Sequence, residues 1–241
     1  MTKVAVISGS ASGIGQATAI KLAEMGFALA LVTRNQSLDQ TKCALPRQAE
    51  YNEYRCDIAD ESQVKNLFLS VMADFGRVDV VINNAGVGSM GFIANVPTEE
   101  FDRVFNINCR GTFFMCREAA EFMGNGGAII NVSTGITHSS EIGMGVYVAS
   151  KLAVEGLSKT LAKELGSKGI RVNTVSPGMT DTPMLMGGHA DKLKASGAAM
   201  TALKRLGEAK DVANVIAMLV SDEGRWITGN NIQAGGGSVI Y

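Results

Sequence analysis

The hydrophobic residues of this chain gather in short runs that are separated by longer stretches with helical spacing. Seven segments are candidate strands, and most of them are continuous apolar runs instead of alternating ones. Such runs are typical of strands that are buried on both faces of a parallel sheet. The candidate strands are residues 4–8, 28–32, 51–56, 80–83, 128–132, 170–175 and 231–234.

The stretches between these runs carry one apolar stripe each. Ile14, Thr18, Leu22 and Met25 recur at helical spacing after the first run, and a similar stripe follows over residues 154–165. Strands that alternate with amphipathic helices predict a doubly wound, Rossmann-type α/β sheet. We expect about seven parallel strands with helices on both faces, in one domain spanning residues 1–241. The least regular segment, about residues 181–205, is predicted to be a substrate lid inserted within it.

Composition and charge narrow the possible partners. The formal net charge is −1, which provides no electrostatic footprint for nucleic acid or an anionic membrane surface. Charged residues make up 19% of the chain, below the ~25% of average domains, which suggests that another copy covers part of the surface. The four cysteines show no metal-ligand spacing, so we expect reduced thiols, no metal site and a cytoplasmic protein.

A glycine-rich turn joins the first predicted strand to the first helix. Gly9, Ser12, Gly13, Ile14 and Gly15 lie where backbone N–H groups at a helix start can bind a pyrophosphate. The spacing G-x-x-x-G-x-G differs from the G-x-G-x-x-G fingerprint, and no Gly-Lys-Ser/Thr of a P-loop follows. An ordinary glycine-rich turn is the alternative. The position between strand and helix favours a dinucleotide site.

The end of the second predicted strand bears on which dinucleotide binds. An acidic residue there would hydrogen-bond the ribose 2′-hydroxyl of NAD, but this chain has Thr33 and Arg34. No carboxylate is present to repel a 2′-phosphate, and a guanidinium can pair with one. These two residues favour NADP(H). The alternative for Arg34 is a solvated surface charge.

Candidate chemistry lies farther along the chain. Tyr147 and Lys151 are four residues apart on one predicted helix, and therefore on one face of it. An ammonium beside a phenol favours the phenolate, and a phenol whose pKa is lowered can exchange a proton with a carbonyl or alcohol oxygen. Ser133 and Thr134 follow the fifth predicted strand, where ligands of doubly wound sheets bind. One of these hydroxyls can converge with Tyr147, or both can simply cap the strand end.

Further motifs extend over almost the whole chain. Asn83-Asn84-Ala85-Gly86 follows the fourth predicted strand, Asn108 lies three residues before Gly111, and Pro177-Gly178 follows the sixth. With the glycine-rich turn and the Tyr147 helix, these motifs resemble those of the short-chain dehydrogenase/reductase family. The cofactor-binding residues that the resemblance implies, together with those argued above, are Gly9, Ser12, Gly13, Ile14, Gly15, Thr33, Arg34, Asp57, Ile58, Asn84, Ala85, Gly86, Tyr147, Lys151, Pro177, Gly178, Thr180 and Thr182.

The resemblance also implies a mechanism and an assembly. Tyr147 would be the general acid, Lys151 would lower its pKa and hold the nicotinamide ribose, and Asn108 would hold a water behind Lys151. The family's usual serine, thirteen residues before the tyrosine, is Thr134 here, with Ser133 one residue earlier. We place Thr134 first, because neighbouring residues of a strand face opposite sides. The family is commonly homotetrameric, which agrees with the low charge fraction.

The expected reaction interconverts a carbonyl and a secondary alcohol with NADP(H), and the substrate itself stays open. A 3-oxoacyl thioester or another ketone is the first hypothesis, and a sugar, polyol or steroid is a comparable one. A catalytically silent cofactor-binding sensor or scaffold is the alternative of another class. The candidate substrate-lining residues are Thr137, His138, Ser139, Glu141, Met144, Met179, Met184, Met186 and His189.

Overall fold

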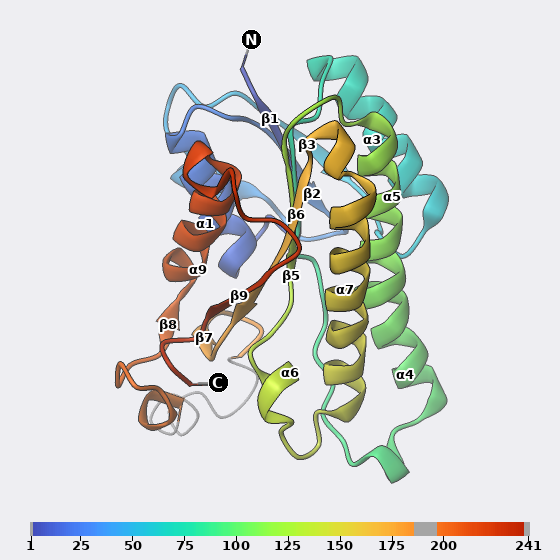
Figure 1. Ribbon diagram of the computed structural model, residues 1–241, viewed down its shortest axis with the longest axis vertical. Helices are drawn as coiled ribbons and strands as arrows, with labels where there is room; N and C mark the ends of the chain where they lie inside the picture. The colour runs from blue at the N-terminus through green and yellow to red at the C-terminus, as the bar shows by residue number, and fades with distance from the viewer. Residues whose placement is uncertain (1, 186–196, 239–241) are drawn as a thin grey trace.

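The computed structural model describes residues 2–185 and 197–238, and its centre is a parallel sheet of seven strands (Figure 1). The strand order is β3-β2-β1-β4-β5-β6-β9, which is the doubly wound order with the crossover between β1 and β4. All seven predicted strands are present and differ from the predicted bounds by at most two residues. The strands are β1 (Val4–Ser8), β2 (Ala28–Thr33), β3 (Tyr51–Arg55), β4 (Val80–Asn83), β5 (Ala128–Val132), β6 (Arg171–Pro177) and β9 (Asn231–Ala234).

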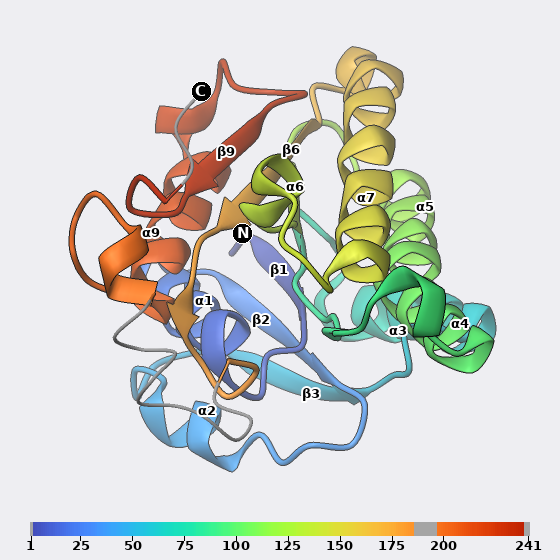
Figure 2. The ribbon, with the colours of Figure 1, turned by 90° about the horizontal axis from the view of Figure 1, so that it is seen from below.

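Helices cover both faces of the sheet. The helices α1 and α9 lie on one side and α3, α5 and α7 on the other, as Figure 2 shows from below. A π-helical turn (Asn106–Gly111) joins α4 to α5. The helices are α1 (Gly13–Glu24), α2 (Asp39–Ala44), α3 (Glu61–Phe75), α4 (Thr98–Phe105), α5 (Thr112–Phe122), α6 (Ile136–Ser139), α7 (Gly145–Glu164) and α9 (Ala209–Val220), with short turns of 3₁₀ helix at Ile93–Asn95, Gly166–Lys168 and Asp222–Gly224.

Each face of the sheet has its own hydrophobic core. On the α3/α5/α7 side, Phe68 packs with Val81 and Ile129, and on the α1/α9 side, Leu22 packs with Ile130 and Ile216. Because β1, β2, β4 and β5 contribute to both cores, they are buried along their whole length. This explains why they appear in the sequence as continuous apolar runs.

The strand β3 differs because it lies at the edge of the sheet. Only β2 pairs with it, and Asn52 and Glu53 are exposed. An edge strand needs fewer apolar residues, since one side faces solvent. In the sequence, the turn residues that bound this segment and its place between two predicted helices indicate a strand more clearly than its hydrophobicity does.

The predicted lid falls partly on residues 186–196, which lie outside the described residues, together with Met186 and His189. At its base, β7 (Thr180–Asp181) and β8 (Gly207–Glu208) form a separate two-stranded parallel pair. The two ends of the predicted lid therefore lie side by side, at the β7–β8 pair. Within the described residues, no helix is both long enough and apolar enough to cross a membrane.

Candidate active site

The glycine-rich turn lies at the carboxyl end of β1 and is fixed by the loop after β4. The Asn84 side-chain amide donates to the carbonyl oxygens of Ser8 and Gly9, at 3.1 Å each. Gly9 has φ of +68°, and a Cβ on Gly15 would lie 2.1 Å from the Gly9 oxygen. A side chain at position 15 is therefore excluded. Asn84 of the N-N-A-G motif holds the turn in place through its two hydrogen bonds.

The start of α1 fits a pyrophosphate group. Ser12 is the N-cap residue and its side chain makes no capping hydrogen bond, and the first turn of α1 carries no acidic residue. The N–H groups of the first turn are therefore available to an anion. Thr182 lies against Gly13, since a Cβ on that glycine would be 3.3 Å from the threonine side chain. Two predicted cofactor residues that are far apart in sequence thus meet here.

Arg34 and Asp57 lie beside each other at the ends of β2 and β3. Their charged groups are 3.8 Å apart and both side chains are substantially exposed. An exposed pair of this kind contributes little, so a 2′-phosphate can replace the carboxylate as the partner of Arg34. The N-cap of α3 is Asp60, which accepts from the N–H groups of Ser62 and Gln63, and not Asp57. Asp57 is therefore not needed to cap this helix.

Two predicted catalytic residues meet at the end of β5. The Thr134 hydroxyl lies beside the Tyr147 phenol, and its interaction with the phenol lowers the pKa of Tyr147. Ser133 is turned away, because its hydroxyl donates to Glu155 Oε1 at 2.6 Å. The structure thus brings Thr134, and not Ser133, to Tyr147, as strand alternation suggested. Glu155 was not a candidate from the sequence, although its position eight residues after Tyr147 puts it on the same helix face.

Burial dominates the ionisation of the Tyr147 and Lys151 pair. It raises the pKa of Tyr147, and the interaction with the neighbouring Thr134 hydroxyl opposes that rise. Burial also lowers the pKa of Lys151 from 10.5 to about 8. The Lys151 ammonium donates to the Val132 carbonyl oxygen at 2.8 Å. Without cofactor, burial thus governs the pKa of Tyr147, and the Lys151 ammonium is held by the backbone oxygen of Val132.

Asn108 lies in the π-helical turn and connects the loop after β4 to α7. Its side chain is fully buried, accepts from the Val87 N–H at 2.8 Å, and donates to the Val87 oxygen and the Ser150 hydroxyl. A Cβ on Gly86 would lie 3.1 Å from Asn108 Oδ1 and 3.3 Å from Lys151 Nζ. Gly86, Asn108 and Lys151 therefore converge on one point.

The segment after β6 completes the same edge of the sheet. The Pro177 oxygen accepts from the Gly135 N–H at 2.8 Å, and Thr180 donates to the Gly178 oxygen. A Cβ on Gly178 would lie 2.7 Å from the Gly235 Cα, so these two backbones touch. Sequence analysis missed this role of Gly235, because a glycine run after the last strand indicates only a turn.

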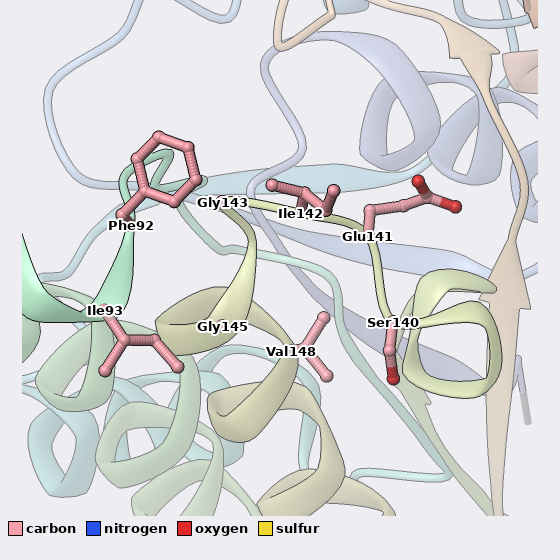
Figure 3. A pocket seen from close by; sticks show the side chains of 8 residues that line it. All are labelled: Phe92, Ile93, Ser140, Glu141, Ile142, Gly143, Gly145 and Val148. Atoms are coloured by element: carbon pink, nitrogen blue, oxygen red, sulfur yellow. The ribbon is translucent and has the colours of Figure 1, made fainter.

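A pocket of about 350 Å³ lies against the first turn of α7 (Figure 3). Phe92, Ile93, Ile142 and Val148 give it a mostly apolar lining, and Glu141 adds one carboxylate. Of the predicted lining residues that the structure describes, Glu141 alone belongs to this pocket. Phe92, Ile93 and Ile142 could not be predicted as lining residues from the sequence. They come from two loops, one after β4 and one before α7, that lie together only in the folded chain. Ser140, Gly143 and Gly145 complete the lining.

Comparison with known proteins identifies the family. The family described as enoyl-(acyl carrier protein) reductase matches residues 9–238. The short chain dehydrogenase claC of Passalora fulva is 37% identical, over 98% of this chain and 94% of that protein. The chain belongs to the short-chain dehydrogenase/reductase family. It is an oxidoreductase by family, and the resemblance inferred from its motifs is confirmed.

Other members carry more specific names. A protein of Arabidopsis thaliana named NADPH-dependent aldehyde reductase 2, chloroplastic, is 35% identical over 99% of this chain and 94% of its own length. The 3-oxoacyl-[acyl-carrier-protein] reductase FabG of Thermotoga maritima is also 35% identical, over 99% and 98%. A solved structure of a Serratia marcescens short-chain dehydrogenase/reductase mutant superposes with a TM-score of 0.92 at 30% identity, covering 98% of this chain and 97% of that one. The doubly wound fold is thereby confirmed.

Proposed function

We propose that this protein interconverts a carbonyl compound and a secondary alcohol with NADP(H), with Tyr147 as the acid and base. The proximity of the Thr134 hydroxyl to the Tyr147 phenol, one helical turn from buried Lys151, is the observation that carries the proposal. Two hydroxyls at one point can bind one substrate oxygen, one polarising it and the other exchanging a proton with it. A silent sensor or scaffold would not need this arrangement.

Each residue of the site has a role in this proposal. The turn at Gly9–Gly15 and the segment from Pro177 to Thr182 would hold the dinucleotide, which supplies or accepts the hydride. Thr134 donates to the substrate oxygen and Tyr147 gives it a proton as the carbonyl is reduced. Lys151 holds the ribose and its charge stabilises the resulting phenolate. Asn108 fixes the loop that faces Lys151 and would hold the water behind it.

The preference for NADP(H) rests on the end of β2. Among the residues that the structure describes, the charged partner of Arg34 is Asp57, at 3.8 Å, and Thr33 is buried with its hydroxyl bonded to the Gln36 backbone. The names of the NADPH-dependent aldehyde reductases support the same preference. Thr33→Asp should lower the ratio of kcat/KM for NADPH over NADH by about 100-fold, because a carboxylate would repel the 2′-phosphate. Thr41→Ala, which removes another buried hydroxyl near this loop, is the control; an unchanged ratio in Thr33→Asp would refute the assignment.

The pocket beside α7 supports a substrate with an apolar arm. Phe92, Ile93 and Ile142 can cover an alkyl, acyl or aromatic group, while a sugar or polyol would find few hydrogen-bond partners there. We therefore propose a small ketone or aldehyde with an apolar substituent. A 3-oxoacyl thioester is the second candidate, since relatives carry that name and its acyl chain is apolar.

We also propose a homotetramer in the cytoplasm. Phe101 of α4, Phe113 of α5 and Leu152 of α7 are each more than 40% exposed on helices of one side of the domain. Apolar side chains in such a position can pack against the same helices of another copy. Light scattering should give the mass of four chains, and a monodisperse monomer at micromolar concentration would overturn this part.

A substrate panel tests the proposed reaction. Ketones, aldehydes, 3-oxoacyl thioesters, sugars and steroids are followed at 340 nm with NADPH and with NADH. We expect turnover of apolar carbonyl compounds that depends on Tyr147. If NADPH binds, as seen by its fluorescence, but no substrate is turned over, the silent binding protein is the better description.

A further inference from the structure

Three consecutive residues that leave β5 are held by three successive turns of α7. The Val132 oxygen accepts from Lys151, the Ser133 hydroxyl donates to Glu155, and the Thr134 hydroxyl lies beside the Tyr147 phenol. Tyr147, Lys151 and Glu155 are spaced by four residues and so form one column on the helix. The strand end and the helix are therefore joined at every residue where the proposed chemistry lies.

The Glu155 contact is the one that the proposed reaction does not explain. Glu155 and Ser133 are 5% and 3% exposed, and their bond of 2.6 Å is short. Among the described residues, the Ser133 hydroxyl is the hydrogen-bond partner of this carboxylate, and no cation is paired with it. A carboxyl group buried against a single hydroxyl is costly, so an apolar side chain would stabilise the fold better. Its presence one turn beyond Lys151 needs a reason other than packing.

We propose that Glu155 and Ser133 are positioning residues that set the register of α7 against the end of β5. Their bond fixes the turn of the chain between Val132 and Thr134, and so fixes where the hydroxyl of Thr134 meets the phenol of Tyr147. Without it, α7 can slide or rotate slightly over the strand end, and small displacements of reacting groups are costly to rate. This inference rests on the proposed roles of Tyr147 and Lys151.

The chain offers a matched control one turn farther along α7. Ser158 is buried, and its hydroxyl accepts from the Asn131 amide of β5 at 2.8 Å. Ser158→Ala therefore removes a similar contact between the same two elements, away from Tyr147. Glu155→Ala and Ser133→Ala break the proposed pair, whereas Glu155→Gln retains an oxygen that accepts from Ser133.

We expect Glu155→Ala to lower kcat by about 10-fold to 100-fold while the dissociation constant of NADPH changes by less than about threefold. Ser133→Ala should act in the same direction with about a fivefold loss, and the double variant should be no worse than Glu155→Ala. Glu155→Gln should stay within about threefold of the unchanged protein, and Ser158→Ala should lower thermal stability with kcat retained. The pH profile of kcat/KM should shift upward only in Glu155→Ala and Ser133→Ala, because Tyr147 loses the alignment that favours its phenolate.

Tyrosine labelled with ¹³C at Cζ gives a second measurement that needs no turnover. The Tyr147 resonance, identified by its loss in Tyr147→Phe, should move in Glu155→Ala and Ser133→Ala and coincide with the original in Ser158→Ala. If Ser158→Ala moves the resonance as much, or if Glu155→Ala leaves both the resonance and the pH profile unchanged, the pair is structural only and the proposal fails. Absence of turnover in the unchanged protein would instead count against the proposed function, and the resonance would still decide the positioning role.

Discussion

The two faces of β4 and β5 differ toward the carboxyl ends of the strands. Toward α1 and α9, the strands present Ile82, Ile130 and Val132, which pack in an apolar core. Toward α5 and α7, Asn83 and Asn131 follow the apolar starts of the same strands, and both are buried. Asn83 donates to the Asn131 side chain at 2.7 Å, and Asn131 donates to Ser158 of α7.

From this difference we infer which side of the sheet carries the proposed chemistry. An apolar face needs only the right volume and tolerates changes of shape, whereas a buried polar network needs each partner in place. Ser158, which pairs with the polar face, lies on α7, the helix that also carries Glu155, Lys151 and Tyr147. We infer that the network fixes α7 against β4 and β5 and contributes mainly to stability, and that the α1/α9 face tolerates changes of side-chain shape more readily.

The largest expected effect is on the polar face. Tyr147→Phe removes the proton donor and should lower kcat by about 1,000-fold or more, with little change in thermal stability. Tyr51→Phe, at the other end of the sheet, is the matched control and should keep its activity. The measurement is NADPH oxidation with the best substrate of the panel. If Tyr147→Phe retained its activity, the assignment of the catalytic proton transfer to this face of the sheet would be wrong.

The sequence allowed the fold to be predicted because the central strands are buried on both sides. Short, continuous apolar runs such as that of β2, bounded by turn residues, are typical of strands in a parallel sheet, and all seven strands were found. Strand alternation also explains why Thr134 lies beside Tyr147 while the Ser133 hydroxyl points to Glu155. These features depend on local pattern and on spacing.

Other features of the site could not be predicted because they depend on tertiary burial. Whether Lys151 or desolvation dominates the pKa of Tyr147 depends on which groups surround the phenol in the folded chain. The spacing of two residues along a helix gives no information about those groups. The partner of Glu155 lies 22 residues away, on a strand end whose register against α7 is set by packing. The pocket beside Val148 is likewise formed by two loops that meet only in the folded chain.

A pair of conservative substitutions sharpens the comparison of the two faces. Asn131→Leu keeps the branched shape of the side chain but removes the amide that accepts from Asn83 and donates to Ser158, so the free energy of unfolding should fall by about 2 kcal/mol. Ile130→Val, one residue away on the apolar face, should cost about 1 kcal/mol. Urea unfolding of both variants gives the two values. Equal losses would mean that the faces do not differ in their tolerance of shape.

Replacing Lys151 on the polar face should stabilise the fold. Burial lowers the pKa of Lys151 to about 8 from 10.5, so folding is penalised by about 3 kcal/mol below pH 8, where the amine is protonated in both states. Between pH 8 and 10.5 the unfolded chain binds more protons than the folded one, and the penalty fades as pH rises. Lys151→Met loses the bond to Val132, worth about 1 kcal/mol, and should therefore be about 2 kcal/mol more stable at pH 7. Urea unfolding at pH 7 and pH 9.5 should show this gain falling to less than half. A gain that is absent at pH 7, or that grows with pH, would mean that Lys151 is not held at a cost to the fold.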